Sequence, residues 1–251
     1  MSFDRDLWSG AYARARFPRF HCSHCKTGRL HFDKDTIVVS EPQYSKGARE
    51  HPDWEPDWNI ERFSAKLVCD DTACGEVVVV SGDTIAAEYF DEDFNVWGYM
   101  ELLRPQFFFP APPVIGIPNE VPSKITDEIG KASQLFWVDL NSCANRLRVS
   151  VELLLTDFKI PEMGLDKNGK PKPLDLNARI ALFEKVDPEH AQTLTALRVI
   201  GNLGSHGSDV AREPLIDAFE IYEDALTELY GQRKARIAKL RKKLIDTRGR
   251  Y

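Results

Sequence analysis

One helical stretch that ends among glycines decides the fold of the second half of the chain, Leu197-Arg198-Val199-Ile200-Gly201-Asn202-Leu203-Gly204-Ser205-His206-Gly207. Arg198, Asn202 and His206 are four residues apart, so an unbroken helix would place them on one polar stripe. Each of the three glycines lowers helix stability by about 1 kcal/mol relative to alanine. The stretch therefore predicts a close backbone approach, by a neighbouring helix or by a second subunit.

A second motif lies upstream, where Arg148 and Glu152 are separated by Val-Ser-Val and followed by three leucines. Together with the Asn202 and His206 pair, this motif resembles the HEPN superfamily of helical bundles, and within it the bacterial branch called domain of unknown function 4145. The resemblance covers about the second half of the chain. It departs from the ribonuclease members at Gly201, where those members have arginine.

The resemblance implies a degenerate site in a nucleic-acid-associated binding or interaction module, linked to bacterial phage defence or restriction. In that module Arg148 and Glu152 would form a structural pair that holds the Asn202 turn. The alternative that the resemblance implies is a metal-independent endoribonuclease. His206 would then move the proton of a 2′-hydroxyl, Asn202 would bind the phosphate, and Arg198 would stabilise the charge of the transition state.

The resemblance also implies that such bundles pair about a two-fold axis, so we expect a homodimer through the helical domain. RNA, DNA or other defence-system proteins are the expected partners. A scaffold that recognises only proteins is a third interpretation.

Helical periodicity extends outward from these motifs in both directions. The apolar residues from Ser123 onward recur at three- and four-residue spacings, and Asp139 supplies a cap between two helices. A last helix opens at Pro214, and its stripe persists weakly into the carboxy-terminal tail, which predicts one helix running on. The segments expected are helices over 124–138, 141–157, 176–186 and 188–204, with an exposed loop over 158–175.

The first half is marked by two close cysteine pairs, Cys22-Ser-His-Cys25 and Cys69-Asp-Asp-Thr-Ala-Cys74. Each spacing lets a tight turn point both thiolates at one tetrahedral ion, which is typical of zinc ribbons. We expect one structural Zn²⁺ per chain on these four cysteines. Redox thiols and incidental cysteines are the alternatives, and His21 and His24 are possible substitute ligands.

Between and after the cysteine pairs, β-branched residues recur with a period of two, which predicts short strands. Residues 41–63 interrupt that pattern as a long insertion whose Trp54 and Trp58 cover a thin core or stack on a partner. Six prolines in 104–122 then predict an extended strap that cannot continue a helix or a central strand.

The predicted fold class is α+β. The expected domains are a zinc-ribbon-like β domain at 1–103, the proline-rich strap at 104–122, and an all-α HEPN-like helical domain at 123–251. No apolar run is long enough to cross a bilayer and no signal peptide is apparent, so we expect a cytoplasmic protein with no membrane partner.

The charge is unevenly distributed along the chain. Residues 1–230 carry 24 basic and 38 acidic side chains, whereas residues 231–251 carry nine basic and one acidic. Such a tail binds phosphate backbones, docks on the acidic surface of a neighbour, or is a solvated helix end. The expected nucleic-acid contacts are Arg233, Lys234, Arg236, Lys239, Arg241, Lys242 and Lys243.

Overall fold

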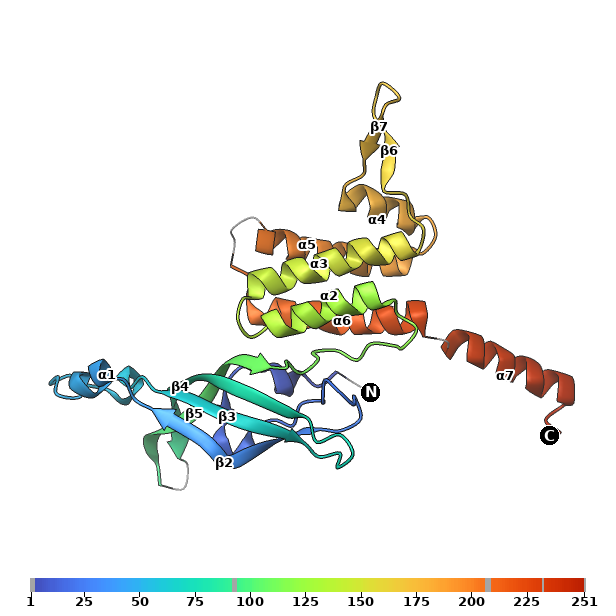
Figure 1. Cartoon of the computed structure of the whole chain (residues 1–251). Coiled ribbons are helices and arrows are strands. Elements are labelled where there is room, and N and C mark those ends of the chain that lie inside the picture. Colours follow the sequence, from blue (N-terminus) through green and yellow to red (C-terminus); the bar gives the residue numbers. More distant parts are fainter. Residues whose placement is uncertain (1–2, 92–93, 206–208, 232, 251) are drawn as a thin grey trace. The chain divides into compact units, whose positions relative to one another are not determined.

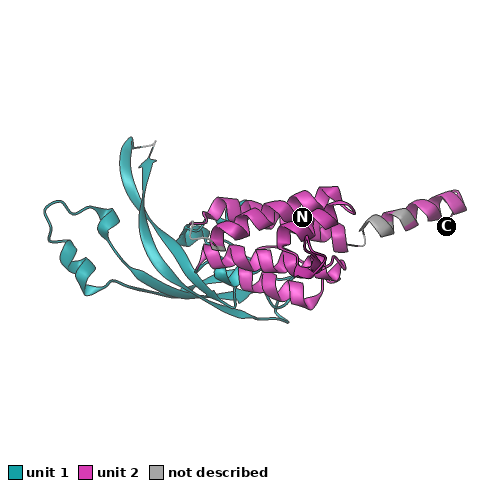
Figure 2. Cartoon of the chain, turned by 90° about the horizontal axis from the view of Figure 1, so that it is seen from above, with its two compact units in different colours: residues 1–113, 133–138 teal, residues 114–132, 139–251 magenta. Residues whose placement is uncertain are grey.

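The computed structural model describes residues 3–91, 94–205, 209–231 and 233–250. It divides the chain into two compact units. Unit 1 is Met1–Pro113 with Ser133–Val138, and unit 2 is Val114–Ala132 with Asp139–Tyr251 (Figure 2). The β-rich first unit and the helical second unit confirm the predicted α+β class. Among the described residues, no helix is both long and apolar enough to cross a membrane.

Unit 1 is built on a five-stranded antiparallel sheet in the order β1-β5-β4-β3-β2 (Figure 1). Two short 3-10 helices, η1 (Arg5–Trp8) and η2 (Arg14–Arg16), flank β1. The insertion between β2 and β3 folds as α1 (Gln43–Ala48) and η3 (Pro56–Trp58). The strands are β1 (Tyr12–Ala13), β2 (Leu30–Ser40), β3 (Arg62–Cys69), β4 (Val77–Asp91) and β5 (Val96–Phe109).

Alternation along the central strands places one face of the sheet in the core. Leu67 pairs with Val78 and Ala65 with Val80, and all four side chains are buried. A cluster of aromatic side chains, most of them from outside the sheet, covers this face. Phe17 stacks on Phe32 at 4.5 Å between ring centroids, and the others in this cluster are Trp8, Phe20, Phe108, Phe136 and Trp137. The thin core is therefore filled by the amino-terminal segment and by the turn after α2.

The expected strap begins later than the sequence predicts, because residues 104–109 belong to β5. The strand accommodates Pro105 at an irregularity: Ser81 pairs with Phe107 and Gly82 with Pro105, so Gln106 is an extra residue. A bulge is one of the few places where a strand tolerates proline, since the ladder hydrogen bond is already interrupted there. The strands are also longer than the short ones expected.

The insertion does not bury both of its tryptophans. Trp58 is 43% exposed and lies against His51 with ring centroids 5.4 Å apart, whereas Trp54 is half-buried. Ser45 ties the insertion together, because its hydroxyl accepts a hydrogen bond from the Ile60 amide. The expected core-covering role is therefore not seen for Trp58.

Unit 2 is a helical bundle with a small hairpin, and Figure 1 shows α3, α5, α2 and α6 lying side by side. The sequence predicts an exposed loop over residues 158–175. This segment instead contains a two-stranded hairpin of β6 (Met163–Leu165) and β7 (Pro171–Pro173). The helices are α2 (Ser123–Leu135), α3 (Leu140–Asp157), α4 (Leu176–Glu184), α5 (Pro188–Ser205), α6 (Arg212–Tyr230) and α7 (Arg233–Thr247).

The helix boundaries follow the predicted signals closely. The Asp139 side chain caps α3 by accepting a hydrogen bond from the Ser142 amide, and Asp175 caps α4 through the Ala178 amide. The predicted apolar stripe is buried in the bundle, including Ile125, Ile129, Cys143, Leu147, Val151 and Leu154. Periodicity thus identified the core of unit 2 directly.

The basic tail is a separate helix and does not continue α6 as expected. Helix α6 ends at Tyr230, and Gly231 follows with an extended backbone of φ −66° and ψ 130°. Tyr230 is fixed by a 2.9 Å hydrogen bond from its hydroxyl to Asp157. The apolar stripe crosses this break, which is why the sequence pattern alone concealed it.

Candidate functional sites

Two chain reversals bring the four predicted cysteines of unit 1 together. In the first reversal the Cys22 amide donates to the Gly28 carbonyl at 3.0 Å and the Lys26 amide donates to the Cys22 carbonyl at 3.1 Å. In the second, the Cys74 amide donates to the Asp71 carbonyl at 2.9 Å. Each reversal places two thiols on the same side of its turn.

The four sulfurs form one cluster. The ligand atoms of Cys22, Cys25, Cys69 and Cys74 all lie within 4.8 Å of one another. Across the two reversals, Cys22 Sγ is 3.8 Å from Cys74 Sγ and Cys25 Sγ is 3.7 Å from Cys69 Sγ. A tetrahedral ion with metal–sulfur bonds of about 2.3 Å requires sulfurs about 3.8 Å apart. The spacing fits one metal ion, and it is well beyond a disulfide bond of about 2.0 Å.

The pKa values of the clustered thiols differ with their surroundings. Hydrogen bonds from the Thr27 side chain and the Gly28 amide lower the pKa of Cys25 to about 6. Burial raises the pKa of Cys69 to about 12 and also contributes to the raised pKa of Cys74. Four thiols this close do not all ionise unless a cation lies among them. A divalent ion reverses that balance, because coordinated thiols lose their protons.

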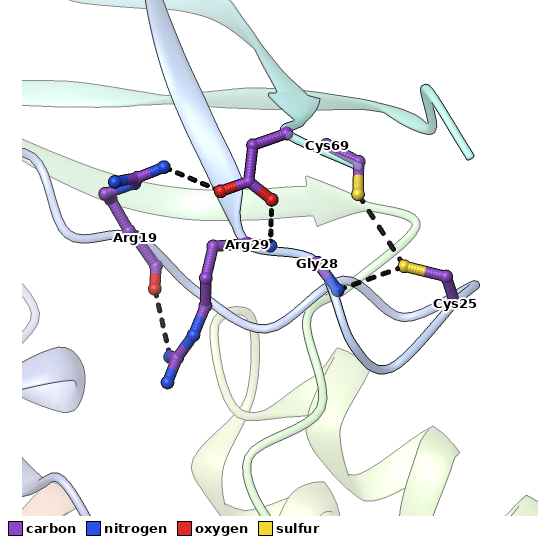
Figure 3. Close-up of polar contacts among 6 residues, drawn as sticks. Arg19, Cys25, Gly28, Arg29 and Cys69 are labelled. Atoms are coloured by element: carbon purple, nitrogen blue, oxygen red, sulfur yellow. Dashed lines mark hydrogen bonds and ion pairs between the residues drawn. The ribbon is translucent and has the colours of Figure 1, made fainter. Parts of the chain in front are cut away.

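Gly28 is needed where the two reversals meet (Figure 3). A Cβ at this position would lie 2.4 Å from Cys69 Sγ, and its own amide donates to Cys25 Sγ at 3.2 Å. Any larger residue would therefore push one sulfur out of the cluster.

Asp70 joins the two reversals beside the sulfurs. Its carboxylate accepts from the Arg29 amide at 2.7 Å and from the Arg19 guanidinium at 2.7 Å. The Arg29 guanidinium in turn donates to the Arg19 carbonyl at 3.3 Å (Figure 3). This network of hydrogen bonds sets the register of the two segments independently of the thiols, and the sequence analysis missed it.

The two histidines named as substitute ligands lie outside the four-sulfur cluster. His24 Nδ1 is 3.5 Å from Cys74 Sγ, where it can hydrogen-bond to a ligand. His21 forms a β-bridge with Arg29, and burial lowers its pKa. Within the described residues, the candidate metal group consists of cysteines alone.

A second polar cluster lies in unit 2, between α3 and α5. The Arg148 guanidinium donates to Asn202 Oδ1 at 2.9 Å, and its Nε lies 3.5 Å from Glu152 Oε1. Arg148 and Glu152 are therefore neighbours on α3, as their spacing predicts, and Arg148 also reaches the Asn202 turn of α5. The Arg148 side chain is 28% exposed, so its contact with Asn202 is partly shielded from water.

Gly201 occupies the position where α5 comes closest to α3. A Cβ on Gly201 would lie 2.5 Å from Arg148 Cβ, and one on Gly204 would lie 2.4 Å from the Asn141 carbonyl oxygen. The neighbouring helix of the same chain therefore accounts for these two glycines. An arginine at 201 would collide with Arg148, so the packing of α5 on α3 leaves no room for one at this position.

Of the remaining predicted site residues that the structure describes, only Arg198 lies near the cluster of Arg148, Glu152 and Asn202. Arg198 lies one helical turn before Asn202, and its buried Nε has no hydrogen-bond partner among the described residues. His206 lies outside the described residues, as does Gly207. In the basic helix, Lys239, Arg241, Lys242 and Lys243 are exposed, whereas the side chains of Arg233, Lys234 and Arg236 are not described.

Comparison with known families gives one match in each half of the chain. The family described as domain of unknown function 8608 matches residues 10–108, and the family described as domain of unknown function 4145 matches residues 130–244. The second match confirms one part of the predicted resemblance, the likeness of the second half of the chain to domain of unknown function 4145. No curated protein and no solved structure matches the chain.

Proposed function

We propose that this protein is a nucleic-acid-binding module in which a structural zinc ion holds unit 1 together and the basic helix α7 contacts the phosphate backbone. The charge distribution carries the proposal: residues 231–251 have a net charge of +8, against −14 for the rest of the chain. Cations clustered on one exposed helix neutralise phosphates and release their counterions, which supplies affinity independent of sequence.

Zinc is the ion proposed for the cysteine cluster. Four thiolates in a closed tetrahedral arrangement suit Zn²⁺ and leave no position for a water molecule or substrate. The ion would therefore serve the fold. The same two reversals are the reason to propose a zinc-ribbon-like character for unit 1.

The bundle supports a HEPN-like architecture in unit 2. The hydrogen bond between Arg148 on α3 and Asn202 on α5 joins the two sequence motifs on which the resemblance is based. By the same resemblance we propose a setting in phage defence or restriction. Gly201 is required for the packing of α5 on α3. We therefore assign the cluster of Arg148, Glu152 and Asn202 a role in holding the bundle together and in binding, without catalysis.

Salt-dependent binding tests the proposal. Fluorescence anisotropy with a labelled single-stranded RNA and a DNA duplex should give affinities that fall steeply as salt rises. The double variant Lys239→Glu with Lys242→Glu should weaken both and flatten the salt slope. The matched control is Lys167→Glu with Lys170→Glu, two exposed lysines of the β6–β7 turn, which should leave the slope unchanged. Equal effects of the two double variants would reject α7 as the contact.

Ribonuclease activity is the second candidate, and the Arg148–Asn202 contact favours it because it places a guanidinium beside the residue expected to bind phosphate. In that case His206→Ala should abolish RNA cleavage and leave salt-dependent binding intact. Arg148→Lys should also reduce cleavage, since an ammonium cannot reproduce the guanidinium geometry. RNA that stays intact with the wild-type protein, with or without added Zn²⁺, rejects this candidate.

A further inference from the structure

The end of the sheet formed by β4 and β5 stands apart from the other strands. Strand β3 pairs with β4 only as far as Asp83, and β1 pairs with β5 at Leu102 and Leu103. Beyond those points the two strands pair with each other, from Ala86 opposite Glu101 to Asp91 opposite Val96. Figure 2 draws this part of unit 1 as two paired strands that extend from the sheet. We call residues 86–91 and 96–101 the aromatic arm.

One face of the aromatic arm is an exposed aromatic surface. Phe90 pairs with Trp97 and Glu88 with Tyr99. Side chains opposite each other, and those two residues apart on one strand, share a face of the sheet. Phe90 is 43% exposed, Trp97 72% and Tyr99 41%, and the rings of Phe90 and Trp97 lie 5.3 Å apart. Contiguous exposed apolar surface is a common mark of an interaction site.

Carboxylates border these rings. The Tyr99 hydroxyl donates to Glu88 at 3.1 Å and lies 3.4 Å from a Glu55 carboxylate oxygen, and the first contact contributes most to raising the pKa of Tyr99 to about 12. Both glutamates are exposed, and neither forms an ion pair among the described residues. This face therefore suits a ligand that is both apolar and cationic.

Helix α7 has the complementary character. Ile237, Leu240 and Leu244 follow helical spacing and form one apolar stripe, with exposures of 39%, 40% and 49%. By the same spacing Arg241 and Lys243 border the stripe, whereas Lys239 and Lys242 lie on the opposite face. The stripe is unexplained by phosphate binding, which needs only the charges.

We propose that the aromatic arm binds helix α7 of a second copy of this chain. Ile237, Leu240 and Leu244 pack on Phe90 and Trp97, and Arg241 pairs with Glu88. The two surfaces match in length: three stripe positions span about 10 Å of helix, and the face from Ala86 to Phe90 spans about 13 Å. Two copies related by a two-fold axis make this contact twice.

Charge argues against the other ligands for the arm. A nucleic acid or an anionic membrane would meet the unpaired carboxylates of Glu55 and Glu88, which repel phosphate. A basic amphipathic helix complements both the aromatic rings and the carboxylates of this face. Every copy of the chain carries such a helix, α7, so it is present at the same concentration as the arm. In the docked state Lys239 and Lys242 remain outward, so phosphate binding by α7 and docking of its stripe use different faces.

Analytical ultracentrifugation of the full chain tests the proposal. The wild type should be a dimer at micromolar concentration, and Trp97→Ala or Leu240→Asp should each weaken dimerisation at least tenfold. Glu88→Lys should also weaken dimerisation. The double variant Glu88→Lys with Arg241→Glu should restore dimerisation, because the charge pair is re-formed with reversed signs. Two controls should leave the dimer unchanged: Phe109→Ala, an aromatic residue 60% exposed outside the arm, and Lys242→Glu on the far face of α7.

Mixing two defective variants identifies the second copy as the source of the helix. Trp97→Ala chains retain α7 and Leu240→Asp chains retain the arm, so their mixture should form heterodimers with one intact contact while each alone stays monomeric. A wild-type protein that remains monomeric overturns the proposal, as does a dimer that neither variant weakens. Association of α7 with anionic vesicles in place of dimerisation overturns it as well.

Discussion

The two units join distant segments of the chain by different means. In unit 1 the reversals at Cys22–Cys25 and Cys69–Cys74 meet through four sulfurs spaced for one ion. In unit 2 helices α3 and α5 meet through direct backbone contact at Gly201 and Gly204. Under the proposal above, the first junction depends largely on a bound metal ion that can be removed, whereas the second depends only on backbone shape. Stability should therefore fail in different ways in the two units.

The largest loss of stability is expected when the four-cysteine site can no longer hold its proposed metal ion. Cys69→Ser, or a strong chelator, should unfold unit 1, because a structural zinc ion contributes about 10 kcal/mol or more, comparable to the whole stability of a domain. Unit 2 should keep its helices, since none of the cluster residues belongs to it. Circular dichroism should show retained helical signal with a loss of the aromatic near-ultraviolet signal.

The matched control is Cys143→Ala, which removes a buried thiol in α3 that lies outside the cluster. It should leave the near-ultraviolet signal and the metal content unchanged. Loss of both units together in Cys69→Ser would contradict the separation of the two junctions.

A smaller loss of stability is expected when a side chain is added at Gly201, where α5 contacts α3. Gly201→Ala should destabilise unit 2 by about 1–3 kcal/mol, because the new methyl group collides with Arg148 Cβ. Gly130→Ala on α2 is the control, since nothing lies within 4 Å of its Cβ position. There alanine should stabilise by about 0.5–1 kcal/mol through helix propensity. Urea melts of the two variants should move in opposite directions, and the comparison fails if they move together.

The cap of α3 contributes less. Asp139→Ala should cost about 1 kcal/mol, since the Ser142 amide loses its acceptor. Hydrogen bonding from Ser142 lowers the pKa of Asp139, so this contribution is present above about pH 4, near the unfolded value, and is lost as the pH falls through the folded pKa. Thermal melts across that range should converge for wild type and variant at low pH. Asp127→Ala, an exposed residue within α2, should show no such convergence.

The smallest effect concerns the Arg148–Glu152 pair. Its 3.5 Å separation and the 41% exposure of Glu152 make it a screened surface pair. Glu152→Gln should therefore change the stability of unit 2 by less than about 0.5 kcal/mol. Arg148→Ala should cost more, because it also leaves Asn202 without its donor. Equal melting shifts for the two variants would show that the contact with Asn202 contributes nothing.

Patterns with a local physical cause were predictable from the sequence. The cysteine spacing identified the four clustered thiols, and helical periodicity predicted helices α2 to α6 of unit 2 to within a few residues. The Asp139 cap followed from side-chain chemistry alone. In each case the determining interaction lies within one turn or one repeat of the residues concerned.

Features that depend on tertiary contacts were not predictable in this way. Strand β5 passes through Pro105 because an extra residue in the ladder absorbs it, and no local pattern reveals that register. The break at Gly231 was hidden by an apolar stripe that continues on both sides. Asp70 was overlooked because its partners, Arg19 and Arg29, flank the other reversal and are distant from Asp70 in the sequence.

The central claim is that four cysteines hold one zinc ion that joins the two reversals of unit 1. Zinc K-edge X-ray absorption on the purified full chain, with metal analysis of the same sample, tests it most directly. We expect one zinc per chain, coordinated by four sulfurs at about 2.3 Å. A content well below one zinc per chain, or a first shell containing nitrogen or oxygen in place of sulfur, would contradict the claim.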